Sequence, residues 1–395
     1  MVRLENSLAQ GEPLIRVAIV ITRLDLGGAQ EVALETAARL DPRRFDARLI
    51  AGPGGFLDGE AKKRLGARFF TLPSLLHPIA PLQDLQALFE LWTYFRREKI
   101  QVVHTHSSKA GLLGRMAAWL ARVPRVVHTV HGWSFNDEQG GGSFLLYQGL
   151  ERLLAHFTDV LAVVAQSCRD KGLLNGVGKP HQYALLRAAV DLKLWARVPH
   201  NKRALLAALR KGPKPLKQAP RFVVGCIANC KAQKNPLDFV RVAARVLKDV
   251  PQACFVYVGD GPLKADAQAL AASLGIGPRV RFVGWQKDPQ ALAAGFDVFL
   301  LCSLYEGLPC VFPQVLIQGT PVVATGVDGA AEIVREGVNG YLCQPRDVEA
   351  LASRVTALLS DKALRQNLGA AARLSVGEEF TVEDMVSRTA GLYSA

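Results

Sequence analysis

The sequence predicts an α/β protein made of two doubly wound, Rossmann-like domains that face a cleft. First, 395 residues are more than one hydrophobic core usually organises. Second, strand-sized apolar runs alternate with helical patterns, which is typical of parallel sheets with right-handed crossovers. Third, this alternation occurs twice, once on each side of a basic segment at 197–221. Ligands of such sheets bind at the carboxyl ends of the strands.

The first series begins with a strand rich in β-branched residues at 14–21. It leads into Gly27-Gly28, after which apolar residues keep helical spacing as far as residue 40. The later strands expected in this half are 45–51, 102–104, 126–130 and 160–164, and the expected helices are 82–97 and 110–121.

The second series begins at Phe222. Its expected strands are 222–228, 254–258, 280–283, 298–301 and 321–324, and its expected helices are 236–248, 263–274, 288–294, 310–318 and 347–359. Pro313 fits the fourth of these helices only within the first turn, because proline has no N–H for an internal helical bond. The predicted divisions are an N-terminal domain at 1–196, a linker at 197–221, a C-terminal domain at 222–379 and a terminal helix at 380–395, which in such folds often returns to the other domain.

Composition argues for a soluble globular protein of the cytoplasm. Apolar residues make up 49 % of the chain and charged residues 21 %, which excludes wholesale disorder. No stretch approaches the roughly 18–20 apolar residues of a membrane span. Residues 1–13 lack the apolar block of a signal peptide. The seven scattered cysteines include no CxxC pair, so reduced thiols are expected rather than disulfides or a zinc site.

The formal net charge is +13, and residues 197–221 hold eight basic residues and no acid. Such a charge favours polyanionic partners, namely a nucleotide's phosphates, nucleic acid or an anionic membrane face. A solvated basic linker explains the segment equally well. The sequence has no zinc-finger spacing and no aromatic–basic stretch, and aromatic residues are only 7 %, so no nucleic-acid partner is expected.

Two loops at strand ends are candidate anion sites. Gly27-Gly28 opens a helix whose first N–H groups could meet an anion, although the GxGxxG pattern is incomplete and a plain tight turn is an equal alternative. Lys231 and Lys234 follow the strand at 222–228 and could grip a diphosphate as point charges. The alternative is two solvated lysines.

A third loop, at 303–309, places the Glu306 carboxylate where ligand hydroxyls would meet it. Backbone amides around Gly307 could hold a phosphate. Gln314 would lie about one turn into the following helix. The alternatives are a solvated carboxylate and a surface amide.

Four histidines, His104, His106, His128 and His131, cluster around two consecutive strands. Histidines two or three positions apart at strand ends do not force a common metal ligand set, and no carboxylate accompanies them in sequence, so no metal is expected. One histidine that acts as a hydrogen-bond donor or a base is the favoured interpretation.

Short motifs occur in one order along the chain: Gly27-Gly28-Ala29-Gln30, Val130-His131-Gly132, Gln233-Lys234-Asn235-Pro236, Val258-Gly259-Asp260-Gly261-Pro262-Leu263, Ser303-x-x-Glu306-Gly307, Gly319-Thr320-Pro321-Val322-Val323-Ala324-Thr325, Gly329-x-x-Glu332 and Gly337-Val338-Asn339-Gly340-Tyr341-Leu342. Together they resemble the family 4 glycosyltransferases, retaining enzymes of GT-B fold that use nucleotide sugars. The resemblance spans roughly residues 14–393 and is most specific between 222 and 342.

The resemblance implies a role for each matching residue. Lys234 contacts the donor diphosphate, and Glu306 is the first glutamate of the E-x7-E motif and contacts the donor sugar. His131 lies near the transferred sugar, so His131 and Glu306 are the expected catalytic residues. The expected donor-binding residues are Gly27, Gly28, Asn229, Lys231, Lys234, Gly307, Leu308, Pro309 and Gln314.

Three positions depart from the family pattern. Asn229 stands where an arginine is usual, and Lys231 is the expected substitute for its charge. Gln314 replaces the second glutamate of E-x7-E and can still hydrogen-bond a ribose hydroxyl. Ala188-Ala189 replaces the first half of an Asn-Gly-Val-Asp run.

The implied function is a metal-independent hexosyltransferase that needs no cofactor and moves a sugar, with retention, from a UDP-sugar to a saccharide or lipid-linked acceptor. Its implied setting is bacterial-type polysaccharide or glycolipid assembly, in the cytoplasm or peripherally on the inner face of the membrane. Two alternatives stay open: a sugar-nucleotide 2-epimerase of the same fold, and a non-catalytic nucleotide-sugar-binding partner, which Asn229 and Gln314 favour.

The expected membrane contact is a basic, partly apolar face of the N-terminal domain. Its basic residues cluster at Lys62-Lys63-Arg64, at Arg96, Arg97 and Lys99, and at Arg115, Arg122 and Arg125, and the last set is interleaved with Leu112, Leu113, Met116, Trp119 and Leu120. The alternative is that Leu112, Met116 and Leu120 form the core face of that helix.

Overall fold

The structure, a computed structural model, describes residues 14–211 and 219–394. The chain divides into two compact units. The first unit comprises the described residues of Met1–Val164, Cys168–Ala188 and Val382–Ala395, and the second comprises those of Ala165–Ser167 and Ala189–Thr381. The expectation of no signal peptide at 1–13, and the basic residues Lys214 and Lys217, lie outside the described residues.

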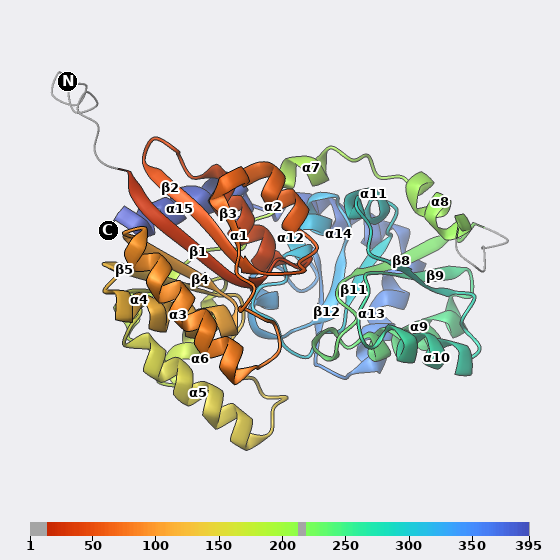
Figure 1. The fold of residues 1–395 in the computed structure, drawn as a ribbon. Helices are drawn as coiled ribbons and strands as arrows, with labels where there is room; N and C mark the ends of the chain where they lie inside the picture. Colours follow the sequence, from red (N-terminus) through yellow and green to blue (C-terminus); the bar gives the residue numbers. More distant parts are fainter. Residues whose placement is uncertain (1–13, 212–218, 395) are drawn as a thin grey trace. The chain divides into compact units, whose positions relative to one another are not determined.

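The first unit contains a parallel sheet of seven strands (Figure 1). In spatial order the strands are β3 (Phe69–Thr71), β2 (Phe45–Gly52), β1 (Ile15–Arg23), β4 (Val102–His106), β5 (Arg125–Val130), β6 (Val160–Val163) and β7 (Tyr183–Leu185).

The second unit contains a parallel sheet of six strands. In spatial order they are β10 (Val280–Gly284), β9 (Ala253–Val258), β8 (Phe222–Ile227), β11 (Val298–Leu301), β12 (Val322–Thr325) and β13 (Gly340–Cys343). Both sheets therefore have the Rossmann strand order, which reverses between β1 and β4 in the first and between β8 and β11 in the second. The predicted fold class of two doubly wound α/β domains is confirmed.

Helices connect the strands of each sheet. Those that begin in the first unit are α1 (Gly28–Arg39), α2 (Asp58–Leu65), α3 (Pro81–Arg97), α4 (Ser108–Ala121), α5 (Gly141–Ala155) and the C-terminal α15 (Val382–Ser394). Helix α6 (Gln166–Leu174) lies where the chain passes between the units. Those of the second unit are α7 (Leu192–Ala196), α8 (Arg203–Lys211), α9 (Pro236–Asp249), α10 (Lys264–Ser273), α11 (Pro289–Ala293), α12 (Val311–Ile317), α13 (Val348–Ser360) and α14 (Lys362–Leu374).

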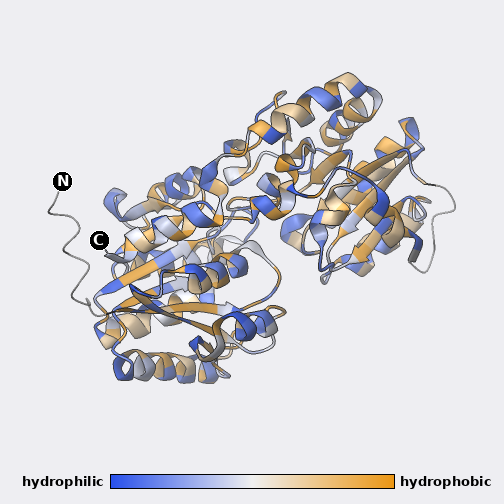
Figure 2. Ribbon diagram, turned by 90° about the horizontal axis from the view of Figure 1, so that it is seen from above, coloured by the Kyte–Doolittle hydropathy of each residue, from blue (hydrophilic) through white to orange (hydrophobic). Residues whose placement is uncertain are grey.

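Strand interiors form the core of each unit. The central strands β1, β8 and β11 are buried along almost their whole length, as strands covered by helices on both faces must be. Figure 2 shows hydrophobic residues running along the strands, whereas the helices carry both hydrophobic and hydrophilic residues. Pro313 is the third residue of α12 and so lies in its first turn, as expected.

The basic segment contains an ordered helix in place of a continuous linker. Leu205 and Leu209 of α8 are fully buried within the second unit. Lys202, just before this helix, forms an ion pair with Asp297 at 2.7 Å. The periodic leucines of α8 are the signal that the interpretation as a solvated linker missed.

Helix α4 buries a different face from the one expected. Arg115 is fully buried, where its Nη2 donates to the Glu151 carboxylate at 2.9 Å and its Nε to the carbonyl of Gly111 at 2.7 Å. The expected basic face at Arg115 is therefore wrong. The expected core face is wrong too, because Leu113 is buried while Leu120 is exposed. An internal ion pair, which spacing alone does not show, turns Arg115 inward.

Candidate active site

The loops that follow β8 and β11 come together where the strand order of the second sheet reverses. This is the position at which open α/β sheets bind ligands. Lys234 follows β8, and its ammonium group forms an ion pair with the carboxylate of Glu306, which follows β11. The structure thus brings together the two residues that the resemblance assigns to the donor diphosphate and the donor sugar.

The Glu306 carboxylate is held in one orientation. Its residue is 8 % exposed, and Ser303 donates from its hydroxyl to Oε1 at 2.6 Å. The backbone N–H of Glu306 donates to the Asp328 carboxylate at 2.7 Å. Oε2 receives only a long contact of 3.5 Å from the side chain of Gln233 among the described residues. Oε2 therefore keeps the capacity to accept hydrogen bonds from ligand hydroxyls.

Gln233 ties the two loops to each other. Its carbonyl accepts the backbone N–H of Leu304 at 2.8 Å, and its side-chain amide donates to the carbonyl of Tyr305 at 3.0 Å. These contacts fix Lys234, the next residue, relative to Glu306. Of the three N–H groups of the Lys234 ammonium, one meets Glu306, and no other described residue is bonded to the rest. The ammonium can therefore bind an anion without leaving Glu306.

The loop that follows β9 packs against the loop that follows β8, just before Lys234. Gly259 and Gly261 have φ of 147° and 152°, and a Cβ on them would lie 1.9 Å from the carbonyl oxygen of Ala228 and 2.7 Å from that of Cys230. The Cys230 N–H donates to the carbonyl of Asp260 at 2.9 Å. Glycine is required here because the two backbones approach so closely.

Asn229 and Lys231 lie on the same strand edge. The backbone carbonyl of Asn229 accepts the hydroxyl of Tyr257 at 3.2 Å, and no described residue is bonded to its side-chain amide. The side chain of Lys231 is exposed. The pKa of Lys231 lies below its ordinary value, because the surrounding protein partly removes water from the ammonium group and Lys234 repels it. Two mutually repelling cations mark this edge as electropositive.

The predicted residues after Glu306 are packed into the protein. Gly307, Leu308 and Pro309 are buried, and the Gly307 carbonyl accepts the N–H of Gly329 at 2.9 Å. Pro309 has no N–H to offer to a phosphate, so it can only shape the loop. Gln314 is half-buried on α12.

In the first unit, Gly27 and Gly28 begin α1 at the same topological position of the other sheet. Nearby, the hydroxyls of Thr22 and Ser107 are hydrogen-bonded at 2.7 Å. Glu31, in the first turn of α1, is a residue that the sequence analysis missed. Burial raises its pKa to about 7, and the carboxylates of Glu35 and Glu60 add to this rise.

The four histidines are all hydrogen-bonded within the first unit, but only His106 and His131 are bonded to each other. Nδ1 of His106 lies 2.9 Å from Nε2 of His131, and Thr105 bonds to Nδ1 of His128 at 2.8 Å. His104 bonds to Tyr393 of α15 and to Thr129, each at 2.6 Å. Burial lowers the pKa of His104 to about 3 and that of His131 to about 4. Within the described part of the chain, no group of three or more His, Cys, Asp or Glu side chains is placed to hold a metal ion.

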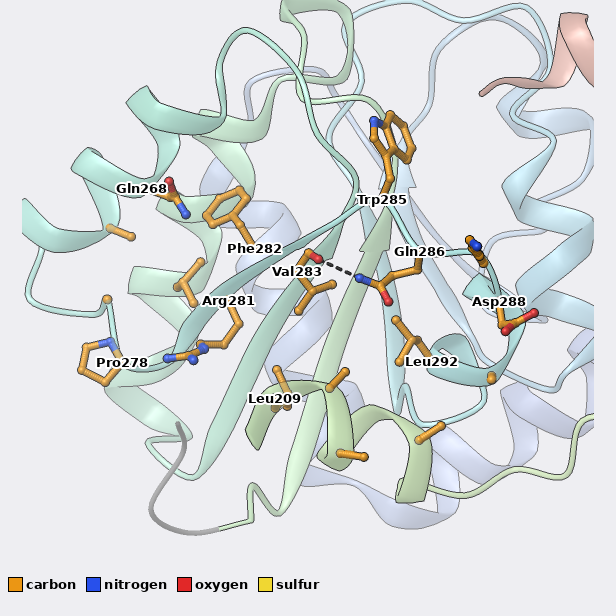
Figure 3. A pocket seen from close by; sticks show the side chains of 18 of the residues that line it. Leu209, Gln268, Pro278, Arg281, Phe282, Val283, Trp285, Gln286, Asp288 and Leu292 are labelled. Atoms are coloured by element: carbon orange, nitrogen blue, oxygen red, sulfur yellow. Dashed lines mark hydrogen bonds between the residues drawn. The ribbon is translucent and has the colours of Figure 1, made fainter. Parts of the chain in front are cut away.

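An open groove of about 1180 Å³ lies elsewhere in the second unit, between α8, the end of α10 and the edge strand β10 (Figure 3). Arg281, Phe282 and Trp285 line it, and Gln286 donates to the carbonyl of Val283 at 2.7 Å. None of the predicted site residues is among its described lining. The groove is therefore separate from the Lys234–Glu306 site.

Two family models match this chain. Residues 210–375 match the model described as glycosyl transferases group 1, and residues 27–184 match the model described as glycosyl transferase 4-like domain. The chain belongs to this group 1, GT4-like family of glycosyltransferases, and it is therefore a glycosyltransferase.

Two relatives align with this chain over most of their length. The chain is 30 % identical to the UDP-Gal:α-D-GlcNAc-diphosphoundecaprenol α-1,3-galactosyltransferase of Escherichia coli, over 89 % of each chain. It is 35 % identical to the N-acetyl-α-D-glucosaminyl L-malate synthase of Bacillus anthracis, over 79 % of each chain. The crystal structure of Anabaena HepE with UDP-glucose has the same GT-B fold, with a TM-score of 0.78 and 21 % identity over 96 % of this chain and 99 % of that one.

Proposed function

We propose that this glycosyltransferase moves a hexose from a UDP-sugar to a hydroxyl of a lipid-linked saccharide, in bacterial polysaccharide or glycolipid assembly. The observation that carries the proposal is the Lys234–Glu306 ion pair where the strand order of the second sheet reverses. The name of the Escherichia coli relative, which specifies a UDP-Gal donor and a diphosphoundecaprenol-linked acceptor, supports the choice of donor and acceptor class. The HepE structures with UDP and UDP-glucose support the same donor class.

In the proposed reaction, Lys234 binds the donor diphosphate and Glu306 accepts hydrogen bonds from hydroxyls of the donor sugar. The bond between the anomeric carbon and the phosphate oxygen breaks, and its electron pair leaves with the diphosphate. Positive charge that is already in place stabilises this leaving group as the bond breaks. The acceptor oxygen then bonds to the anomeric carbon from the same face, and its proton passes to the departing phosphate.

Lys231 takes part of the role that an arginine at position 229 would have. The exposed Lys231 and the partly buried Lys234 lie close enough to repel each other, so together they offer two cations to one diphosphate. An ammonium group serves as a point charge, whereas a guanidinium would bind phosphate with two parallel hydrogen bonds. The site therefore keeps its charge but gives up that bidentate geometry. His131 is assigned to the transferred sugar, and Gly27 and Gly28 to the donor phosphates.

An exposed apolar face on α3 supports the proposed contact with an anionic membrane. Leu82, Leu85 and Phe89 follow one another at helical spacing and are 80, 65 and 59 % exposed. Arg96 and Arg97 are exposed in the last turn of the same helix. A helix that carries both exposed apolar side chains and cations fits an anionic lipid surface, where each cation contributes about 1 kcal/mol. Within the described residues, no helix is both long enough and apolar enough to cross a bilayer.

Vesicle binding tests the membrane contact. Leu85→Glu should weaken sedimentation with anionic vesicles, whereas Leu374→Glu, a change at an exposed leucine of α14 in the second unit, should not. High salt and neutral vesicles should weaken binding of the unmodified protein in the same way. Binding that ignores salt and lipid charge would rule the contact out, and a soluble acceptor would then be the better proposal.

Transfer itself is tested with labelled nucleotide sugars, with and without a lipid extract from a polysaccharide-producing bacterium. The proposed reaction produces labelled lipid only when the extract is present. A 2-epimerase would convert the donor without the extract, and a binding protein would give no product in either case. Label that moves into water-soluble saccharide alone would replace the lipid-linked acceptor with a soluble one.

A further inference from the structure

His106 and His131 form a hydrogen-bonded pair of imidazoles at the carboxyl edge of the first sheet. Nδ1 of His106 lies 2.9 Å from Nε2 of His131, and the two ring planes differ by only 28°. Nearly parallel rings whose centroids lie 5.3 Å apart are compatible with a bond between two ring nitrogens. His106 ends β4 and is fully buried, whereas His131 follows β5 and is half-buried.

Both imidazoles are neutral at pH 7. Burial lowers the pKa of His131 to about 4, and burial together with His104, His131 and His128 lowers the pKa of His106 well below its ordinary value. A neutral imidazole carries one N–H and one nitrogen lone pair. A single proton therefore lies between Nδ1 of His106 and Nε2 of His131, and its position sets the role of the second nitrogen on each ring.

Nε2 of His106 decides which ring donates. This nitrogen is buried and has no hydrogen-bond partner among the described residues. If His131 donated, Nε2 of His106 would be an N–H without an acceptor. If His106 donates, Nε2 is only an unused lone pair. Buried N–H groups without partners are rarer than under-satisfied acceptors, so the second arrangement is favoured and His131 carries its proton on Nδ1.

The neighbouring ring of His104 restricts the orientation of His106. The His104 ring packs against it with centroids 4.3 Å apart. His104 is itself fixed at both ring nitrogens, by the hydroxyls of Tyr393 and Thr129. By contrast, no described residue is bonded to Nδ1 of the half-buried His131. The Nδ1–H of His131 is therefore left for a ligand.

We propose that His106 is a positioning residue, which fixes His131 in its Nδ1–H form so that His131 donates a hydrogen bond to a sugar oxygen and does not act as a base. The sugar contact rests on the proposed function, whereas the proton position does not. With the Nε2 lone pair of His131 engaged by His106, His131 has no free site to accept the proton of an acceptor hydroxyl.

Imidazole ¹⁵N chemical shifts of histidine-labelled protein test the proton position without any substrate. The unmodified protein should show His131 protonated at Nδ1. His106→Leu removes the donor and should release His131 into a mixture of both forms. His106→Asn keeps a side-chain N–H close to the original Nδ1 and should preserve the Nδ1–H form. His128→Leu is the matched control, because His128 is a buried histidine of β5 that bonds to Thr105 and not to His131.

Initial rates then test the consequence. His106→Leu should lower kcat/KM for the donor about tenfold, the effect of one hydrogen bond, and His106→Asn should restore most of it. A signal for His131 protonated at Nε2 in the unmodified protein would overturn the proposal whatever the rates are. The proposal would also be overturned if His106→Leu and His106→Asn lost kcat/KM equally while His131 kept its Nδ1–H form in both variants. Failure of every nucleotide sugar as donor would instead refute the proposed function and leave the ¹⁵N result standing.

Discussion

Where its strand order reverses, the first sheet gathers hydroxyls and neutral imidazoles near a partly exposed Arg23–Asp25 ion pair, whereas the second sheet has a largely buried ion pair there. Beside β1 and β4 lie the hydroxyl pair Thr22–Ser107 and the neutral His106, and beside β8 and β11 lies the ion pair Lys234–Glu306. The two sheets share one strand order, so topology alone does not produce this difference. Strand order selects the edge, and the side chains on that edge determine which ligand it can bind. The charged edge of the second sheet suits a diphosphate, and the hydroxyl and imidazole side chains of the first edge suit uncharged ligand hydroxyls.

Acidification should lower the stability of the first unit before that of the second. This is the largest effect expected from the difference between the two units. The pKa values of His104, His106, His128 and His131 all lie below the ordinary value of about 6.5. Below pH 6.5 the unfolded chain therefore binds four protons that the folded unit refuses, and stability falls as pH falls. Glu31 offsets one of these four protons, because its raised pKa makes the folded unit bind a proton that the unfolded chain does not bind. The net loss is on the order of 4 kcal/mol per pH unit below about pH 6.

Hydrogen exchange read by peptide mass spectrometry between pH 7.5 and 5.5 measures this difference, with exchange times scaled for the intrinsic rate. Peptides of β4 and β5 should lose protection while peptides of β8 and β11 keep theirs. The second unit serves as the internal control, because its described residues include one histidine with a lowered pKa, His200, against four in the first unit. Simultaneous loss of protection in both units would contradict the assignment.

Much of the fold could be predicted from the sequence, because buried parallel strands are continuous apolar runs. The strand Val298–Leu301 was predicted with its observed bounds, and most others within two residues. The short strands β3, β7 and β13 were missed, since three or four partly exposed residues carry no such run. Helix α8 was not predicted, because the basic residues of 197–221 favoured a solvated linker over the helical spacing of Leu205 and Leu209.

The site was predicted through local motifs, and its supporting contacts were not. Lys234 and Glu306 stand in recognisable loops, and the structure brings them together. Ser303 contacts Glu306 within the quoted Ser303-x-x-Glu306 motif, but Gln233 and Asp328 support the pair through contacts 22 to 73 positions apart, which no local pattern shows. The inward turn of Arg115 depends in the same way on Glu151, 36 positions away.

Glu306→Gln removes the negative half of the charged edge. The change keeps the shape of the side chain but leaves the Lys234 ammonium without its carboxylate and weakens hydrogen bonds to the donor sugar. Loss of such a charge-assisted bond should lower kcat about ten- to hundredfold at saturating donor and acceptor, with the fold unchanged by circular dichroism. Initial rates equal to those of the unmodified enzyme would show that the charge of Glu306 plays no part in the reaction.

Lys234→Ala removes the positive half. Calorimetric titration with the nucleotide-sugar donor should show a dissociation constant about ten- to hundredfold higher, which corresponds to one charge-assisted phosphate contact of about 1.5–3 kcal/mol. Lys264→Ala is the matched control, because Lys264 pairs with Asp260 in the neighbouring loop and not with Glu306. An unchanged dissociation constant for Lys234→Ala, or an equal rise in the control, would refute the diphosphate contact.

Gln314→Glu should have the smallest effect, and it tests how far the charged edge extends into α12. Gln314 is half-buried, and no described residue is bonded to its side-chain amide, so a carboxylate there would not lose an existing partner. An uncharged amide can hydrogen-bond a ribose hydroxyl, and a carboxylate does so more strongly. The change should therefore tighten nucleotide binding by less than about tenfold or leave it as it is. Glu306 lies only eight positions earlier, so a second carboxylate would weaken binding if the two repelled each other in the site. A large loss of donor affinity in Gln314→Glu would thus show that this enzyme's charged edge ends at Glu306 and that the site requires an uncharged side chain at position 314.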